Sequence, residues 1–312
     1  MQYKRLGKSG LKVSAVGLGG NTFGRYADAQ QTARCIHTAL DVGINFFDTA
    51  DVYNNGVSEE YVGQALTDRR DRALIASKVV MSMGEGPNDR GASRAHLTDG
   101  VHASLRRLGT DHLDLLQLHQ WDAETPIEET MRTLDDLVRD GKVRYVGCSN
   151  YTAWQLVWSL WTSERHNLVS FVSVQPRYSL VDRSIEQELL PMCREFGVGI
   201  IPYSPLAGGV LTGKYQEGQE APPGTRAHGN DRFASQHGTH RNMEIARRAG
   251  EWAEAHGHTT GELAVAWLVA HPEISSVIAG VTKPEQVEAN ARAVDWHLTA
   301  DEVAAVSALT EE

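Results

Sequence analysis

One short unit recurs along this chain: an amphipathic helix, then a glycine, then a buried strand. Residues 125–149 show it clearly, because Thr125 is a candidate N-cap, Pro126 suits the first helical position and Glu128 would complete a capping box. Gly141 suits the left-handed position after the last helical turn, and "KVRYVGCSN" then follows as a strand. The same order recurs before three further strands, after Gly43, Gly109 and Gly197. The sequence therefore predicts an α/β fold made of repeated βα units.

Eight strands of this kind are expected, and the spacing of their carboxyl ends indicates how they are arranged. These ends are predicted near Gly19, Asp48, Lys78, His119, Ser149, Gln175, Tyr203 and Gly280. Most intervals are 26 to 41 residues, the length of one βα unit, and the long interval from 203 to 280 leaves room for extra helices at 242–255 and 261–269. No change of composition divides the chain, so we expect a single (β/α)₈ TIM barrel over residues 1–312.

Two further stretches add detail to this barrel. The segment "YKRLGKSGLKVS" predicts an N-terminal β-hairpin, turning at 8–10, that would plug the N-terminal mouth. Residues 213–239 are rich in Gly, Pro and polar side chains and form a long loop after strand seven, typical of a functional lid or a disordered segment. The alternative fold is a doubly wound open sheet, but the first strand carries "GLGG" and not the GxGxxG fingerprint of that fold.

Composition excludes several classes of protein. A net charge of −10 argues against a nucleic-acid or anionic-membrane surface, and no apolar run reaches the ~20 residues of a membrane helix. The opening "MQYKRLGKSG" lacks the apolar core of a signal peptide. Three widely spaced cysteines fit reduced thiols in the cytoplasm better than a disulfide framework. There is no CxxC pair, no HExxH and no ligand-spaced histidine cluster, so we expect no metal.

Four polar side chains follow three adjacent strands of the predicted barrel. Asp48 ends strand two and Tyr53 follows it, Lys78 ends strand three, and His119 ends strand four. Each alone would be an ordinary rim or core residue, but together they suit proton delivery to a carbonyl group. The Lys78 ammonium would lower the pKa of the Tyr53 phenol, and Asp48 would pair with the buried cation. His119 would donate a hydrogen bond to the substrate oxygen and orient it.

Other polar and aromatic residues near the predicted mouth have two interpretations. Phe23, Trp121 and Asn54 either line a substrate pocket or pack the loops that carry them. Arg177, close after strand six, either meets an acidic substrate or forms a structural ion pair, which we favour.

Several motifs together resemble the aldo-keto reductase superfamily, in particular its bacterial reductases and potassium-channel β-subunit-like proteins. The resemblance rests on "NFFDTADVYNNGVSEEYVGQAL", "IASK", "LDLLQLH", "GKVRYVGCSN" and "IPYSPLAGGVLTGKY", in this order, and it extends over essentially the whole chain. It implies a (β/α)₈ barrel that binds NADP(H) in an extended pose without a Rossmann fold. It also implies that Tyr53 is the general acid, with Asp48, Lys78 and His119 as its partners.

The resemblance extends to the residues that would bind the cofactor. It implies that Ser149, Asn150 and Gln175 hold the nicotinamide carboxamide and that the nicotinamide ring stacks on Tyr203. For the pyrophosphate it implies Ser204, Leu206, Gly208 and Lys214, and for the adenosine end Gly280, Thr282, Gln286 and Asn290. Backbone N–H groups of a Gly-rich loop, a lysine and the helix that begins at Pro284 all suit phosphate. We therefore expect 213–239 to order in part when cofactor binds.

The sequence departs from the family at the position whose side chain contacts the 2′-phosphate of the cofactor. Many relatives have an arginine there, whereas this chain has Gln286. Lys283 would supply a less specific positive charge, so we expect a modest preference for NADPH, with NADH possible.

Three functions follow from these residues. The first is reduction of a small-molecule aldehyde or ketone with NADPH, and the second is a cofactor-binding regulatory subunit like the channel β-subunits. The third is a cofactor-free isomerase or aldolase with Lys78 as a Schiff base, although Asp48 would keep that amine charged. The natural substrate, the favoured direction and the choice between a monomer and a homo-oligomer stay open.

Overall fold

Eight parallel strands form one sheet that curls into a barrel. The computed structural model describes residues 1–215 and 237–311. Neighbouring strands pair in the order β10-β3-β4-β5-β6-β7-β8-β9, and a separate antiparallel pair joins β1 to β2. The strands are β1 Tyr3–Arg5, β2 Lys12–Ser14, β3 Val16–Gly19, β4 Phe46–Asp48, β5 Leu74–Val79, β6 Leu113–Leu118, β7 Val143–Ser149, β8 Ser173–Gln175, β9 Gly199–Ile200 and β10 Val277–Gly280.

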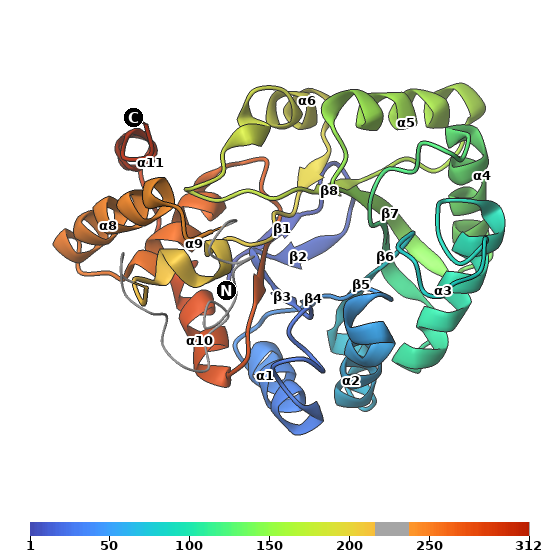
Figure 1. Cartoon of the computed structure of the whole chain (residues 1–312), viewed down its shortest axis with the longest axis horizontal. Helices are drawn as coiled ribbons and strands as arrows, with labels where there is room; N and C mark the ends of the chain where they lie inside the picture. The colour runs from blue at the N-terminus through green and yellow to red at the C-terminus, as the bar shows by residue number, and fades with distance from the viewer. Residues whose placement is uncertain (216–236, 312) are drawn as a thin grey trace.

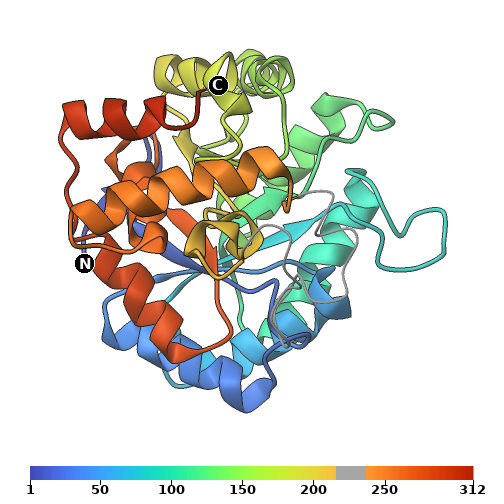
Figure 2. The same ribbon diagram turned by 60° about the vertical axis from the view of Figure 1, so that its left-hand side comes forward.

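Helices surround the strands, and Figure 1 shows them as a ring around the curled sheet. The α-helices are α1 Ala29–Asp41, α2 Val57–Leu66, α3 Arg94–Leu108, α4 Ile127–Arg139, α5 Ala153–His166, α6 Leu189–Phe196, α8 His240–Ala255, α9 Thr260–Ala270, α10 Pro284–Ala293 and α11 Ala300–Ala308. Short 3₁₀ segments are Tyr53–Gly56, Arg70–Arg72, Ser184–Glu186 and Ala207–Thr212. Helices α8, α9, α10 and α11 gather on one side of the barrel in both Figure 1 and Figure 2. Within the described residues no helix is long and apolar enough to cross a membrane.

Backbone hydrogen bonds around β9 and β10, the two ends of this strand order, complete the ring. Ile200 N–H donates to the Glu273 carbonyl at 2.9 Å, and Ser275 N–H donates to the Ile200 carbonyl at 2.8 Å. Ile278 N–H donates to the Pro202 carbonyl at 2.9 Å. The expected (β/α)₈ fold is therefore confirmed, including the extra helices α8 and α9 between the last two strands.

The seventh strand is shorter than predicted. We expected it to run to Tyr203, but β9 covers Gly199–Ile200 only. Pro202 has no N–H to donate to a neighbouring strand, and Ser204 has a left-handed φ of 57°, so the ladder ends early. Tyr203 still lies at this end of the sheet, because it forms isolated bridges with Arg177 and Ile278.

The start of α4 also differs from the prediction. Thr125 does not cap this helix: it lies one residue before the N-cap, and its hydroxyl donates to Asp122 Oδ2 at 2.7 Å. Pro126 occupies the N-cap position, and no side chain caps the helix there. Pro126 has no side-chain acceptor for the terminal N–H groups, so the predicted capping box is absent. The predicted left-handed conformation at Gly141 is confirmed, with φ of 69°.

The N-terminal hairpin plugs the end of the barrel opposite the predicted active-site rim. Its apolar side chains, Leu6 and Val13, are fully buried and belong to the cluster that fills the barrel interior, with Phe46, Ala76, Leu115, Ile201 and Ile278. Lys4 Nζ fastens the hairpin to the helical side by donating to the carbonyls of Val269 at 2.6 Å and Ile274 at 3.1 Å. The hairpin therefore packs the N-terminal end of the barrel interior.

Helices α2 and α3 approach each other closely at Gly63. A Cβ added there would lie 2.4 Å from the backbone oxygen of Leu108, which is at the end of α3. We expect Gly63→Ala to destabilise the fold by about 1–3 kcal/mol through overpacking, even though alanine favours helix by about 1 kcal/mol. Urea unfolding would measure the change. Gly261→Ala is the matched control, because its Cβ would meet nothing closer than 3.9 Å, and an equal loss in both variants would contradict the close approach.

Candidate active site

A fully buried lysine lies at the centre of the candidate site. The period of two along β5 directs Lys78 to the barrel interior, on the same face as the core residue Ala76. Lys78 Nζ donates to Asp48 Oδ2 at 2.7 Å, to the Thr49 carbonyl at 2.9 Å and to Tyr53 Oη at 3.3 Å. An ammonium has three N–H donors, and each of them has an acceptor here.

The carboxylate of Asp48 is satisfied on both oxygens. Its Oδ1 accepts from Gln117 Nε2 at 2.9 Å and from Gln175 Nε2 at 2.9 Å, while Oδ2 accepts from Lys78. We did not predict Gln117. The available signal was an amide on an otherwise apolar strand, two residues before His119 and therefore on the same inward face. Gln175, expected at the nicotinamide, donates one of its N–H groups to the ion pair.

The phenol of Tyr53 is held close to the ammonium. Lys78 Nζ lies 4.9 Å from the centroid of the Tyr53 ring as well as within hydrogen-bond distance of its hydroxyl. Burial raises the pKa of Tyr53, and the opposite influence of Lys78 does not outweigh it. Our expectation of a net lowering was wrong, because the sequence identified the cation but not the degree of desolvation. Tyr53 is therefore a neutral phenol that keeps its proton.

Lys78 stays charged although it is buried. Burial alone would lower its pKa, but the Asp48 carboxylate and Tyr53 outweigh this effect, so that the pKa of Lys78 is raised. His119 behaves in the opposite way, because burial and the Lys78 charge together lower its pKa to about 3. Its ring lies edge-on to Tyr53, with 5.7 Å between centroids. His119 is thus a neutral imidazole, which has one N–H to donate and one nitrogen that accepts.

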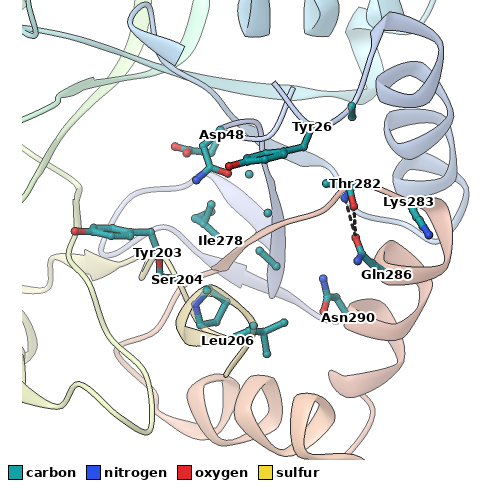
Figure 3. Close-up of a pocket in the computed structure, with 18 of the residues that line it drawn as sticks. Tyr26, Asp48, Tyr203, Ser204, Leu206, Ile278, Thr282, Lys283, Gln286 and Asn290 are labelled. Atoms are coloured by element: carbon teal, nitrogen blue, oxygen red, sulfur yellow. Dashed lines mark hydrogen bonds between the residues drawn. The ribbon is translucent and has the colours of Figure 1, made fainter. Parts of the chain in front are cut away.

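These groups open onto one elongated cavity of about 1400 Å³. Of the residues predicted for the site, Lys78 is buried behind Asp48, and the others line this cavity: Asp48, Tyr53, His119, Ser149, Asn150, Gln175, Tyr203, Ser204, Leu206, Gly208, Lys214, Gly280, Thr282, Lys283, Gln286 and Asn290. Figure 3 shows Asp48 and Tyr203 toward one end, with Lys283, Gln286 and Asn290 toward the other. The cavity therefore connects the tetrad (Asp48, Tyr53, Lys78 and His119) with the start of α10.

Side chains from the segment after β3 also line the cavity, and no sequence pattern pointed to them. They are Asn21, Tyr26, Asp28, Gln31 and Arg34. This segment has no recognisable motif, and α1 reaches the cavity only because it packs against α10 in the closed ring. Figure 3 shows the Tyr26 ring extending across the cavity toward Asp48.

At the Tyr203 end, polar groups form an internal network. Asn150, at a left-handed φ of 57°, donates to the His119 carbonyl at 3.0 Å and accepts from Tyr203 Oη at 3.0 Å. Ser149 Oγ donates to the Gln175 carbonyl at 2.8 Å. Strands β6, β7 and β8 are thereby tied together at their carboxyl ends, and the amide of Asn150 is oriented by its neighbours.

In the middle of the cavity the backbone turns repeatedly through left-handed conformations. Ser204, Ala207, Gly208 and Gly209 have φ values of 57°, 47°, 68° and 105°. A Cβ at Gly209 would lie 2.8 Å from Lys214 Nζ, so the lysine lies directly against this loop. Consecutive peptide groups in such a turn, with a cation beside them, suit an anionic group.

The far end of the cavity is formed by the start of α10. Gln286 Oε1 accepts from the Thr282 backbone N–H at 2.7 Å, as Figure 3 shows, and this bond orients the turn before the helix. Lys283 is exposed at the N-cap position, next to Pro284. The cavity is long, has a polar tetrad at one end, and has cations at its middle and far end. A nicotinamide dinucleotide in an extended pose fits this shape and donor set.

The remaining predicted residues lie outside the cavity. Phe23 is buried and Asn54 Nδ2 packs against Gly24, so both support loops. Trp121 packs against Tyr151, with 5.3 Å between ring centroids. Arg177 pairs with Asp182 at 3.2 Å, so the structural interpretation of this arginine is confirmed. Of the predicted lid, residues 216–236 lie outside the described residues.

Removing the buried cation should destabilise the protein. In Lys78→Met, Asp48 would keep its two amide donors but lose its counter-ion, so we expect a loss of about 3–5 kcal/mol in the free energy of unfolding. Asp48→Asn should be milder, because an amide oxygen can still accept from both glutamines. The exposed Lys8→Met is the matched control, and chemical denaturation compares the three. A Lys78→Met variant as stable as the parent would show that the pair contributes nothing to folding.

Comparison with known proteins identifies the family. The family model described as "Aldo/keto reductase family" matches residues 15–311. The chain is 40% identical to a "Probable voltage-gated potassium channel subunit beta" of Arabidopsis thaliana, over 95% of this chain and 92% of the relative. It is 35% identical to the "Uncharacterized oxidoreductase YrpG" of Bacillus subtilis, over 96% and 92% of the two chains. It is also 33% identical to the "Versiconal hemiacetal acetate reductase" of Aspergillus parasiticus, over 97% and 95%.

The family-model match covers all eight barrel strands and every strand end that lines the cavity, and the chain belongs to the aldo/keto reductase family.

Proposed function

We propose that this protein reduces an aldehyde or ketone to an alcohol with NADPH, and that Tyr53 is the general acid. One observation carries the proposal: a neutral phenol lies 3.3 Å from a fully buried ammonium, at the end of a cavity long enough for a dinucleotide. Family membership and relatives named as an oxidoreductase and a reductase support the same chemistry.

Reduction of a carbonyl requires a hydride at carbon and a proton at oxygen. The reduced nicotinamide, when bound, supplies the hydride. Tyr53 holds the proton for the oxygen, and its O–H bond breaks as the alcohol O–H forms. Lys78 then stabilises the phenolate, since the ammonium is already within hydrogen-bond distance of Tyr53 Oη. Asp48 keeps Lys78 charged throughout, so the stabilising charge is in place before the reaction begins.

His119 has a different task in this proposal. A pKa of about 3 keeps its imidazole neutral over the physiological range, so it donates a hydrogen bond without giving up a proton. It would orient the carbonyl oxygen toward Tyr53. The neighbouring Asn150 fixes the backbone of His119 by donating to its carbonyl at 3.0 Å.

The residues along the cavity would bind the cofactor. Tyr203 offers a ring for the nicotinamide, and the turn from Ser204 to Gly209, with Lys214, offers N–H groups and a cation for the pyrophosphate. The N-terminus of α10 would face the adenosine end. We expect a monomer or homo-oligomer in the cytoplasm, acting on a small-molecule carbonyl substrate.

A second candidate function is a cofactor-binding regulatory subunit. It is favoured by the 40% identity to a protein named as a potassium channel subunit beta. Turnover separates the two proposals. Steady NADPH consumption with a panel of aldehydes supports the reductase, whereas tight cofactor binding without turnover supports the regulatory subunit.

A Schiff-base enzyme is disfavoured by the surroundings of Lys78. The side chain is completely buried, and Asp48 holds the amine in its charged form. A charged amine is not a nucleophile, and a carbonyl substrate could not reach it without displacing Tyr53.

Tyr53→Phe should separate catalysis from binding. Loss of the general acid is worth roughly 10²–10⁴-fold, so we expect kcat to fall by at least that factor while NADPH affinity is retained. Fluorescence titration measures the affinity and the aldehyde assay measures kcat. Tyr61→Phe on α2 serves as the control for loss of a hydroxyl outside the cavity. Near-normal kcat in Tyr53→Phe would remove this residue from the mechanism.

Cofactor choice tests the role of Lys283. The uncharged Gln286 leaves Lys283 as a point charge at the N-cap of α10, and we expect NADPH to be preferred over NADH by roughly 1–2 kcal/mol. Lys283→Ala should erase most of that margin in kcat/KM and leave the NADH value nearly unchanged. Lys142→Ala, far from the cavity, is the matched control. If the parent uses NADH as well as NADPH, Lys283 is an ordinary surface charge.

A further inference from the structure

The turn that presents Tyr53 contains a buried carboxyl group that the proposed mechanism does not use. Tyr53 N–H donates to the Ala50 carbonyl at 3.2 Å, so residues 50–53 form a tight turn between β4 and α2. Asp51 lies at its centre, and Asp51 Oδ1 accepts from the Val52 N–H at 2.6 Å. The Asp51 backbone N–H donates to the Lys78 carbonyl at 3.1 Å. Asp51 therefore holds the turn and anchors it to the strand that carries the ammonium.

The carboxyl of Asp51 has an unusual environment for an aspartate. The residue is completely buried, and in the part of the chain that the structure describes its Oδ2 has no hydrogen-bond partner. Glu59, from α2, is also completely buried, but it has its own partners: Ser77 Oγ donates to it at 2.5 Å and Arg107 pairs with it at 2.6 Å. The Arg107 guanidinium thus already pairs with Glu59.

Charged groups from three elements act on this carboxyl. Burial and the Glu59 carboxylate of α2 raise the pKa of Asp51, while Arg107 of α3 and Lys78 of β5 lower it without outweighing them. The pKa of Asp51 is raised to about 7. The group is therefore neutral in mildly acidic solution and becomes a second buried carboxylate as the pH rises.

We infer that Asp51 is a positioning residue for Tyr53, and that it holds the Ala50–Tyr53 turn in the reactive arrangement only while its carboxyl is neutral. Ionisation would add a second buried negative charge near α2, where the Glu59 carboxylate already pairs with the Arg107 guanidinium. Repulsion would then displace the turn and move the phenol away from Lys78. The inference rests on the proposed role of Tyr53 as the acid, and it adds a pH limit to that role.

The effect on stability has a defined sign. The pKa of Asp51 is higher in the folded protein than the ordinary value of 3.8, so the folded state binds the proton more tightly than the unfolded state. The free energy of unfolding that this proton contributes is fully present below the ordinary pKa of 3.8. It is lost as the pH rises toward 7, the pKa of Asp51 in the folded protein. An asparagine at this position stays neutral at every pH, so its contribution to stability would not change with pH.

The pH profile of kcat/KM for aldehyde reduction at saturating NADPH tests the inference. Above the pKa of Asp51, we expect the parent's kcat/KM to fall by up to roughly tenfold per pH unit. Asp51→Asn, which is isosteric and never charged, should lack this limb. Asp51→Ala, which loses the bond to Val52, should be impaired at every pH. Asp140→Asn, at an exposed aspartate that forms the C-cap of α4, should keep the parental profile.

Two measurements independent of turnover separate this inference from the proposed function. The ¹³Cζ resonance of labelled Tyr53, assigned with Tyr53→Phe, should follow a one-proton titration near pH 7 in the parent and not in Asp51→Asn. The melting temperature of Asp51→Asn relative to the parent should rise between about pH 4 and pH 8. An inactive parent that shows both effects would sink the reductase proposal and leave Asp51 controlling Tyr53. Identical pH profiles and identical ¹³C titrations in parent and Asp51→Asn would overturn the inference.

Discussion

The buried ion pair between Lys78 and Asp48 is the interaction on which the rest of the site depends. Taking two charges out of water is unfavourable, and the pair is tolerated because every remaining donor and acceptor is matched. The ammonium also bonds to a backbone carbonyl and to Tyr53, and the carboxylate also bonds to amides from β6 and β8. One pair of charges therefore ties four strands together at their carboxyl ends. The geometry of the site and the alignment of these four strand ends are two results of the same contacts.

The same cation determines the charge states around it. Together with burial, which is the larger cause, it keeps His119 neutral. It partly offsets the effect of burial on the pKa of Tyr53, and it donates to the Tyr53 hydroxyl. The Tyr53 phenol keeps its proton at rest, and the Lys78 charge beside it stabilises the phenolate. Such a group transfers its proton only when a strong acceptor forms next to it. Lys214 and Lys283 continue the positive charge along the cavity, although the chain as a whole carries a net charge of −10.

Local sequence patterns were sufficient for the fold and for the location of the site. Glycines that permit left-handed turns after helices, and polar residues that end apolar strands, are signals within a few residues of each other. They predicted the strand order, the helices α8 and α9, and the placement of the tetrad on one rim, because parallel strands in a barrel bring all their carboxyl ends to the same face. Where a local signal failed, as at Thr125, the helix begins one residue later and the hydroxyl donates instead to a side chain outside the pattern, the Asp122 carboxylate.

By itself the sequence determined that this chain is a repeated βα barrel with an acid, a base, a phenol and an imidazole at one end. Only the tertiary structure decided the protonation states and the hydrogen-bond partners of these groups. Gln117 and Gln175 reach Asp48 from strands that lie 69 and 127 residues away in the chain. The raised pKa values of Tyr53 and Asp51 depend on burial, which is created by many distant side chains at once and has no local sequence signal. Residue types identify the candidate groups, but the desolvation and the partners that set their protonation exist only in the closed barrel.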